Sequence, residues 1–251
     1  MTLPETMSGV QLTRHGGPEA LVWRDDIPVP KPGLGQVLVR VLAAGVNMTD
    51  SNTRIGWYGE GRAAAWAGEM AFPRIQGSDL CGRIVALGAQ VQGFDLGMRV
   101  ICPTNQHEPT AENPIHFVSI GSEFDGAFAQ YCLIKAQHLH DVSASALSDV
   151  EIGAMPCAYG TAHNLLTRAN LAVGERVLVT GASGGVGMAA VQLALLRGAE
   201  VTAQCSLGKS ARLRAVVSQT YRVRDIARAQ TDLSAGRFAG KLVLIPPEPQ
   251  P

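Results

Sequence analysis

Short segments in which polar and apolar residues alternate fill the first half of the chain, and glycine, proline or asparagine clusters separate them. Such alternation is typical of half-buried strands. The predicted strands are Gln36–Val41, Gly82–Leu87, Met98–Cys102 and Ala127–Ile134. Tight turns between short strands are predicted by the glycines at positions 77, 82, 88, 93 and 97, as in a small barrel or sandwich. Residues 103–125 hold three prolines and little periodicity, which predicts a long surface loop.

The pattern changes near Ser148 to helices and nearly all-apolar strands. Asp149–Leu166 has a capping-type start and helical apolar spacing, interrupted at Pro156. Arg176–Thr180 is a nearly all-apolar run, expected for a strand covered on both faces. Met188–Arg197 predicts a helix and Glu200–Ala203 a second strand. Together these segments predict one βαβ unit.

The last part of the chain predicts helices with one closing strand. The helices are expected at Lys209–Val217 and Asp225–Ala235, and the strand at Gly240–Pro246. No strand is expected between Ser206 and Gln219. The chain ends in a short proline-rich extension.

Composition narrows the function classes. The 251 residues are 46% hydrophobic, which predicts a folded globular protein. Basic and acidic residues balance at 21 each, so bulk charge favours neither nucleic acid nor an anionic membrane as partner. Five scattered cysteines without a CxxC pair, and no apolar leader at the N-terminus, favour reduced thiols in the cytoplasm. The uncharged stretch Val177–Leu196 contains four glycines, so a strand, turn and helix explain it better than a membrane span.

The glycine-rich segment Thr180–Gly187 lies between the predicted strand and helix of the βαβ unit. Glycines there allow a sharp turn and close approach to a pyrophosphate, while helix N-terminal amides face the anion. This context predicts a dinucleotide-phosphate site; the alternative is a glycine turn without a ligand. The predicted contacts are Ser183, Gly184, Gly185, Val186 and Gly187.

The end of the second strand of the unit predicts NADP(H) rather than NAD. A carboxylate there would bind the ribose hydroxyls of NAD, but the strand runs into Gln204 and Cys205. Ser206 and Lys209 follow, and they are expected to contact a 2′-phosphate. The alternative is that such cations are simply solvated. A short-chain dehydrogenase is disfavoured because that family needs a downstream Tyr-xxx-Lys, whereas Tyr221 is followed by Asp225.

At this point the chain resembles the medium-chain dehydrogenase/reductase superfamily, of the zinc-independent quinone oxidoreductase type. The resemblance covers nearly the whole chain and is carried by GGPEALVW, PGLGQVLVRVLAAGVNMTDSNTRIGWY, GSDLCGRIVALG, GAFAQYCLI, YGTAHNLL, VLVTGASGGVG and DIARAQTDLSAGRFAGKLVLIP. It implies an α/β fold in which a GroES-like β-barrel domain is joined to a Rossmann-type nucleotide-binding domain. The implied domains are residues 1–150 (GroES-like), 151–215 (truncated Rossmann, NADPH-binding) and 216–251 (return to the GroES-like domain).

The resemblance also implies the reaction and its residues. Zinc-binding relatives have Cys at the position of Asn47 and a His-Glu pair at Ser78-Asp79, so no catalytic metal is expected. Asn47 and Tyr58 match residues lining the nicotinamide and substrate cleft, and Thr161 matches a threonine near the nicotinamide. The implied activity is NADPH-dependent reduction of quinones or α,β-unsaturated carbonyls, small-molecule substrates, by hydride transfer. Tyr58 would donate a hydrogen bond to the carbonyl oxygen; the alternative is an aromatic residue at the rim.

Two histidine pairs are candidate metal ligands. His138 and His140 are expected on one strand face, and His107 and His116 in one loop, but neither pair has a convincing third ligand. Neither is predicted to bind metal.

A complete Rossmann domain has six parallel strands, and this chain offers two before the C-terminal family segment resumes. The missing units amount to roughly 80–100 residues, with a junction between Arg214 and Gln219. We expect weak or no cofactor binding by the chain alone, and doubtful formation of the homodimers common in the family. The alternative function is a catalytically impaired remnant that acts as a non-enzymatic GroES-like binding module.

Overall fold

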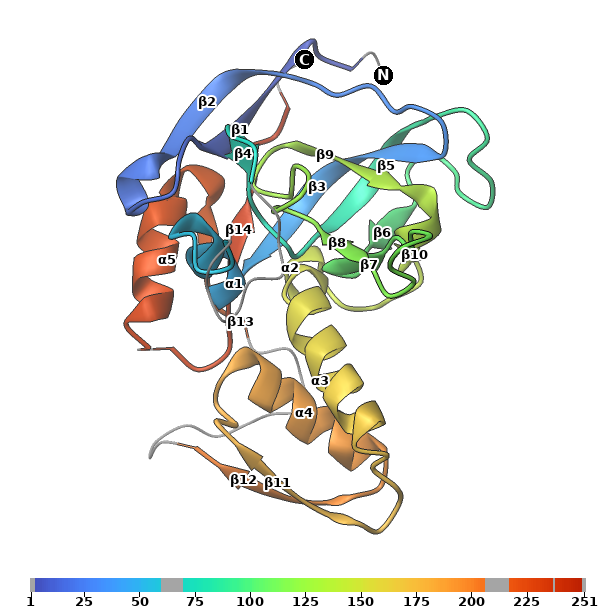
Figure 1. Ribbon diagram of the computed structural model, residues 1–251, viewed down its shortest axis with the longest axis vertical. Helices are drawn as coiled ribbons and strands as arrows, with labels where there is room; N and C mark the ends of the chain where they lie inside the picture. Colours follow the sequence, from blue (N-terminus) through green and yellow to red (C-terminus); the bar gives the residue numbers. More distant parts are fainter. Residues whose placement is uncertain (1–2, 60–69, 206–216, 237, 250–251) are drawn as a thin grey trace.

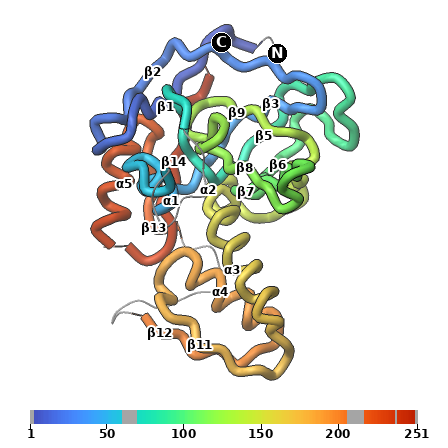
Figure 2. The backbone as a smooth tube through the Cα atoms, viewed as in Figure 1, coloured from blue at the N-terminus to red at the C-terminus, as the bar shows by residue number. Residues whose placement is uncertain are grey.

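A β-rich part and a smaller helical part follow one another along the long axis of the molecule (Figure 1). The computed structural model describes residues 3–59, 70–205, 217–236 and 238–249. The β-rich part holds three sheets, and the smaller part holds a separate two-stranded sheet beside α3 and α4. Figure 2 shows that the chain leaves the β-rich part through α3 and that its C-terminal segment lies in the β-rich part again.

The strands of the β-rich part are β1 (Thr6–Leu12), β2 (Leu21–Pro28), β3 (Gln36–Val46), β4 (Arg74–Ile75), β5 (Cys81–Leu87), β6 (Arg99–Ile101), β7 (Asn105–His107), β8 (Phe117–Ser119), β9 (Tyr131–Lys135), β10 (His140–Asp141), β13 (Val217–Arg222) and β14 (Lys241–Ile245). Its helices are α1 (Met48–Arg54), α2 (Asp149–Gly153) and α5 (Ile226–Ser234). The smaller part consists of α3 (Pro156–Arg168), β11 (Arg176–Thr180), α4 (Gly185–Leu196) and β12 (Glu200–Gln204).

Strand β3 lies at the centre of the largest sheet, whose order is β10-β6-β5-β3-β14-β13, with β9 also paired to β3. Its first half was predicted, but the strand continues five residues further, to Val46. The extension pairs with β14, which places Ala44, Gly45 and Val46 opposite Leu244, Val243 and Leu242. Residues 43–46 are buried, so they lack the polar alternation by which a strand is predicted.

The C-terminal segment completes this sheet. β14 pairs with β3 antiparallel and with β13 in parallel, and α5 joins the two. The prediction of helix up to Val217 was wrong there, because Val217 begins β13; residues 209–216 lie outside the described part. The expectation of no strand before Gln219 was wrong for the same reason. The exposed Ser218, Thr220 and Arg222 alternate along β13 with less exposed residues, of which Gln219 is polar, so the strand pattern in the sequence is weak and the pairing with β14 makes the strand.

The smaller part is the predicted βαβ unit, with β11 and β12 paired in parallel from Arg176↔Glu200 to Thr180↔Gln204. Helices α3 and α4 cover one face, where Val179, Ala162 and Ala189 are buried together. The other face is open, because Leu178 in the middle of β11 is 62% exposed. The prediction that β11 is covered on both faces was therefore wrong. The strand has the composition of a doubly covered one, but only one layer of helices is present in the described part.

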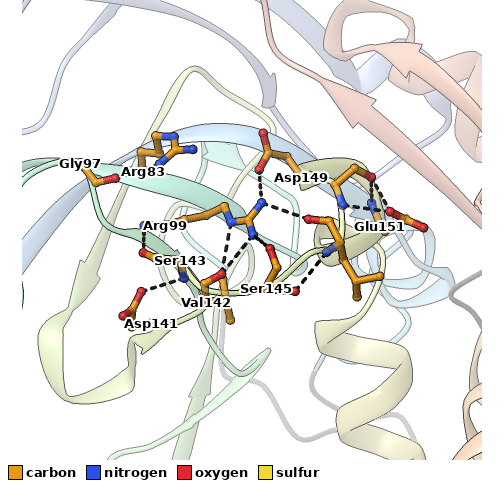
Figure 3. Close-up of polar contacts among 11 residues, drawn as sticks. Arg83, Gly97, Arg99, Asp141, Val142, Ser143, Ser145, Asp149 and Glu151 are labelled. Carbon is orange, nitrogen blue, oxygen red and sulfur yellow. Dashed lines mark hydrogen bonds and ion pairs between the residues drawn. The ribbon is translucent and has the colours of Figure 1, made fainter.

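The turn that leads from β10 to α2 is held by Arg99 (Figure 3). The guanidinium of Arg99 donates to the carbonyl oxygens of Val142, Ser145 and Leu147 and to Asp149 Oδ1, at 2.5–3.3 Å. The buried guanidinium of Arg99 thus donates to carbonyl oxygens that backbone N–H groups would satisfy in regular secondary structure.

Helix α2 begins beside this turn with the predicted cap. Ser148 Oγ accepts from the backbone N–H of Glu151 at 3.3 Å, and Glu151 Oε2 accepts from the backbone N–H of Ser148 at 2.9 Å. The break at Pro156 is also as predicted. Pro156 occupies the first turn of α3, where its missing N–H costs nothing.

Residues 103–125 contain a hairpin where an irregular loop was predicted. β7 and β8 pair antiparallel, with Asn105 opposite Ser119 and Gln106 opposite Val118. Strands of three residues are too short to show periodicity in the sequence. The hairpin forms part of the wall of the cavity described below.

Candidate functional site

A cavity of about 220 Å³ lies between α1, the β7–β8 hairpin and the first turns of α3. The residues that line it are Thr49, Asp50, Thr53, Tyr58, Ser78, Thr104, Asn105, Phe117, Ser119, Ile120, Gly121, Ser122, Cys157 and Thr161. Two predicted site residues, Tyr58 and Thr161, thus meet at one cavity from segments a hundred residues apart. Asn52 Nδ2 donates to the phenol oxygen of Tyr58 at 3.2 Å, which orients the ring.

Asn47, the other predicted catalytic residue, lies beneath this cavity rather than on its wall. Its residue is 8% exposed and precedes the first turn of α1. The Nδ2 group of Asn47 donates to Asp79 Oδ2 at 2.9 Å and to Ser78 Oγ at 3.3 Å. The Asn47 side chain therefore hydrogen-bonds to buried polar partners. The neighbouring Asp50 and Ser78 line the cavity and form its polar floor.

A buried ion pair lies on the other side of Asn47. Lys241 Nζ is 2.8 Å from Asp79 Oδ2, and Nζ also donates to Asn47 Oδ1. Asp79 is fully buried, Lys241 is 6% exposed, and Asp79 Oδ1 accepts the backbone N–H of Cys157 at 2.6 Å. One carboxylate therefore connects α1, the start of α3 and β14. A buried charge of this kind requires a partner, which Lys241 supplies.

Lys241 was not predicted as a site residue, and Asp79 was interpreted only as the replacement of a metal ligand. A signal was present: Lys241 is the one charged residue in the run Lys241–Ile245, and it is nevertheless buried. A cation within a buried strand implies a buried anion, although 162 positions separate it from Asp79 in the chain.

Burial sets the protonation of two side chains on the cavity wall. Burial raises the pKa of Asp50 from 3.8 to about 7; the backbone N–H of Asn47, which donates to Asp50 Oδ2 at 2.8 Å, opposes the rise, and the negative charge of Asp79 adds to it. Burial, with Asp79 nearby, likewise raises the pKa of the Cys157 thiol to about 12. The thiol is therefore protonated and unreactive at neutral pH, whereas Asp50 exchanges a proton there.

The predicted dinucleotide-phosphate site is the segment Thr180–Gly187, called the cradle below. Its backbone forms a tight strand-to-helix turn. Gly181 has a φ of +63°, and a Cβ at Gly187 would lie 2.3 Å from the carbonyl oxygen of Gly181. Helix α4 begins after Gly184, which has no capping side chain, so no N-cap side chain occupies its first amides at the positive end of the helix dipole. The backbone of Ser183–Gly187, including Val186, thus fits an anionic phosphate.

The C-terminal segment contacts this cradle directly. The backbone N–H of Gly240 donates to the carbonyl oxygen of Ser183 at 3.2 Å. A Cβ at Gly185 would lie 3.0 Å from Lys241 Cδ, so the absence of a side chain there also serves internal packing. Lys241 therefore connects the cradle to the buried polar cluster under the first cavity.

The end of β12 carries no carboxylate. β12 ends at Gln204 and is followed by the exposed Cys205. Ser206 and Lys209, predicted to contact the 2′-phosphate, lie outside the described residues. Their placement stays a prediction.

The histidines are placed differently from the prediction. His138 lies in a 3-10 turn, where Nε2 is 2.7 Å from Glu108 Oε1, while His140 is exposed on β10, so the two do not share one strand face. His107 and His116 contact the carbonyl oxygens of Pro114 and Glu108. Over the described ranges, no three His, Cys, Asp or Glu side chains gather as a metal-binding group. In the same ranges no helix has the length and apolar character needed to cross a membrane.

Comparison with known proteins finds relatives that are named as oxidoreductases. The alcohol dehydrogenase GroES-like domain matches residues 33–144. Quinone oxidoreductase of Homo sapiens is 35% identical over 196 residues, which are 78% of this chain and 51% of that protein. Acryloyl-coenzyme A reductase of Metallosphaera sedula is 34% identical over 184 residues, 70% of this chain and 52% of that protein. The chain thus spans about half the length of the curated relatives it matches.

A solved structure agrees over a greater length. The crystal structure of a Sinorhizobium meliloti 1021 protein described as an alcohol dehydrogenase has a TM-score of 0.89 at 30% identity, and the match covers 98% of each chain. The predicted fold class is confirmed: the chain is an α/β protein with a GroES-like β-barrel part and a truncated Rossmann-type part.

Proposed function

The chain belongs to the medium-chain dehydrogenase/reductase superfamily, and from this premise we propose that it is an NADPH-dependent oxidoreductase of the zinc-independent type. The proposed substrates are quinones or α,β-unsaturated carbonyl compounds. The observation that carries the proposal is the cavity that brings Tyr58 and Thr161 together over a polar floor of Asp50 and Ser78. The relatives named as quinone oxidoreductase and acryloyl-coenzyme A reductase support this choice of chemistry.

The side chains under the cavity are poor zinc ligands, which supports a reaction without zinc. Asn47 and Ser78 replace ligands of zinc-binding relatives and offer an amide and a hydroxyl instead of thiolate and imidazole. The Lys241 ammonium, within hydrogen-bond reach of both Asn47 and Asp79, repels a second cation at this place. Activation of the carbonyl group must then come from hydrogen bonds.

The cradle would hold the pyrophosphate of NADP(H) through backbone amides of Gly184–Gly187, and Thr161 would lie near the nicotinamide. When bound, the reduced nicotinamide supplies a hydride. The matching division of the chain is a GroES-like segment 1–150, a cofactor segment 151–215 and a return segment 216–251. Residues 216–251 contribute Lys241, which packs on the cradle at Gly185.

The side chains of the cavity would orient the substrate and stabilise charge. Tyr58 would donate to the substrate carbonyl oxygen as negative charge develops there, and the hydrogen bond from Asn52 to its oxygen strengthens the phenol as a donor. The α-carbon of a reduced enone also needs a proton. Asp50, whose pKa of about 7 keeps about half of the molecules protonated at neutral pH, would supply it, with Ser78 Oγ 3.4 Å from Asp50 Oδ1 as the intermediate group.

The activity test follows NADPH oxidation with a panel of quinones and enones. We expect turnover, and we expect Tyr58→Phe to lower kcat/KM by roughly 10- to 100-fold through loss of the donated hydrogen bond. Trp57→Phe is the matched control, because Trp57 is an adjacent, exposed aromatic residue outside the cavity wall. Equal losses in both variants, or no turnover with any acceptor, would contradict the proposal.

Cofactor affinity is tested separately by isothermal titration with NADPH. Only one βαβ unit of the cofactor-binding part is present in the described residues, so few contacts to the adenosine and nicotinamide ends are available. We expect weak binding. Micromolar affinity would contradict this expectation while leaving the proposed activity intact.

A further inference from the structure

A cavity of about 550 Å³ lies on the β-rich part, where β13 ends, α5 begins and the chain leaves β14 (Figure 1). One wall is apolar and is formed by Trp23 of β2, Ile245 of β14 and the two prolines Pro246 and Pro247. Ile245 is 40% exposed, so this wall is accessible from solvent. The volume falls in the range of small-molecule sites. None of the residues that line this cavity lines the first cavity or belongs to the cradle.

Three arginines line the same cavity. Arg222 ends β13, Arg224 lies in the 3-10 turn that follows, and Arg228 lies in the first turn of α5. Asp225 is the one carboxylate among the described lining residues, so three positive charges against one negative charge leave a net charge of +2. The chain as a whole has 21 basic and 21 acidic residues, so this excess is local. Like charges that line one concave site focus their field on it, which favours the binding of an anion.

Arg222 and Arg224 are exposed and have no competing anion. In the described ranges, neither guanidinium group has a carboxylate within ion-pair distance. Arg224 is nevertheless held in place, because its Cζ lies over the Trp23 ring, 5.0 Å from the ring centroid. Stacking occupies the face of the guanidinium and leaves the N–H groups at its edge free to donate. These two arginines therefore offer accessible donors on the wall of the cavity.

Arg228 is only partly neutralised. Its Nε lies 3.6 Å from Asp232 Oδ2, and the same carboxylate oxygen accepts the Tyr221 hydroxyl at 2.9 Å. The Arg228 side chain is 74% exposed, and ion pairs between positions i and i+4 of an exposed helix face are weak. Arg228 can therefore turn toward an anion in the cavity without losing a strong contact.

Charge and shape together indicate the class of anion. A planar guanidinium presents two parallel N–H groups that match the oxygens of a phosphate or a carboxylate. A phosphomonoester carries a charge of about −1.5 to −2 at pH 7, which balances the net charge of the cavity, whereas a carboxylate carries a single charge. The apolar wall of Ile245, Pro246 and Pro247 favours an apolar body at the other end of the ligand.

We propose that this arginine-lined cavity is a binding site for a small phosphomonoester with an apolar body. Arg222 and Arg224 hold the phosphate, Arg228 adds positive charge beside it, and the body packs on Ile245 and Pro246. The site stands independently of the proposed reductase activity, because none of its residues belongs to the first cavity or to the cradle.

The test uses 1-naphthyl phosphate as the probe and the full chain as the protein. NMR follows the Nε–H groups of Arg222 and Arg224 and the indole N–H of Trp23, while the backbone amides of Gly184–Gly187 report separately on the cradle. We expect saturable shifts at the two arginines and at Trp23. 1-Naphthalenesulfonate, with one negative charge, and inorganic phosphate, without the apolar body, should each bind at least about tenfold more weakly. Neutral 1-naphthol should cause no saturable shift at the arginines.

Two variants and a matched control complete the experiment. Arg222→Gln combined with Arg224→Gln removes both donors and should weaken binding of 1-naphthyl phosphate by about a hundredfold. Arg224→Lys keeps the charge but loses the planar fork and its stacking on Trp23, so it should weaken binding by roughly three- to tenfold. Arg168→Gln removes an exposed arginine of α3 outside this cavity and should leave binding unchanged. Since Arg222 and Arg224 are exposed, urea unfolding should show that each variant keeps its fold.

Several outcomes would overturn the proposal. Wild-type affinity in the double variant would show that the arginines hold no ligand, and shifts confined to Gly184–Gly187 would place the phosphate in the cradle alone. Should the double variant unfold, unchanged affinity in Arg224→Lys overturns the proposal in the same way. An equal loss in Arg168→Gln would show that the charge of the whole chain, rather than the cavity, attracts the probe. Equal affinity for 1-naphthyl phosphate and inorganic phosphate would overturn the role of the apolar wall. Absence of reductase turnover has no bearing on these results.

Discussion

Asp50 provides a quantitative test of how burial shapes the polar floor of the first cavity. The side chain is 4% exposed and shares this buried region with Asp79 and Lys241. Its pKa rises from 3.8 to about 7, so the folded protein holds a proton that the unfolded chain has lost. A carboxyl group with a raised pKa favours folding at low pH, and this contribution is lost as pH rises from the unfolded to the folded pKa.

The perturbation is Asp50→Asn. Asparagine keeps one oxygen that accepts the backbone N–H of Asn47, and its NH₂ group can donate to Ser78 Oγ in place of the bond that Asp50 Oδ1 accepts, but it does not titrate. Between pH 5 and pH 8, linkage with the two pKa values predicts that the wild type loses about 2–3 kcal/mol of unfolding free energy through Asp50 alone. The variant lacks this loss. All other titrating groups are common to both proteins and cancel in the comparison.

Urea unfolding of both proteins at intervals between pH 5 and pH 8 measures the effect. Tryptophan fluorescence is a suitable signal, since Trp23 and Trp57 both belong to the β-rich part. The difference in unfolding free energy between variant and wild type should grow with pH, and it exceeds about 1 kcal/mol for any folded pKa above about 6. Parallel pH profiles would refute the idea that burial keeps Asp50 protonated near neutrality. A ¹³C titration of the Asp50 carboxyl carbon gives the pKa directly.

Three further substitutions test other parts of the structure. Lys241→Met should destabilise the protein by about 3–5 kcal/mol in urea unfolding, because Asp79 is left as an unpaired buried charge; Lys241→Met with Asp79→Asn should recover part of the loss, and no recovery would argue against the ion pair. Arg99→Met should cost about 3 kcal/mol and raise hydrogen exchange in residues 142–149, whereas unchanged exchange would contradict the role of Arg99 in that turn. Leu178→Lys should change stability by less than about 0.5 kcal/mol, unlike Val179→Lys on the covered face of β11; equal costs would show that both faces are covered.

Local patterns in the sequence predicted the elements whose cause is local. The strand and helix of the βαβ unit, the cap at Ser148 and the break at Pro156 all depend on residues a few positions apart, and each is found where it was predicted. The turn of Thr180–Gly187 belongs to the same group, because glycine spacing is a requirement of the backbone itself. The errors concern elements defined by distant partners. The second half of β3 and all of β13 depend on β14, which no local periodicity reveals.

The candidate site shows the same division between local and distant causes. The sequence by itself determined the superfamily, and it predicted the cradle and the site residues Tyr58 and Thr161. Only the tertiary structure decided that these two share a cavity, that Asn47 lies beneath it, and that Lys241 supplies the counter-ion of Asp79. It also decided that Leu178 is exposed although its strand has the composition of a buried one. The physical reason is that burial and charge pairing depend on every segment that packs against a residue, whereas caps and turns depend on its neighbours in the chain.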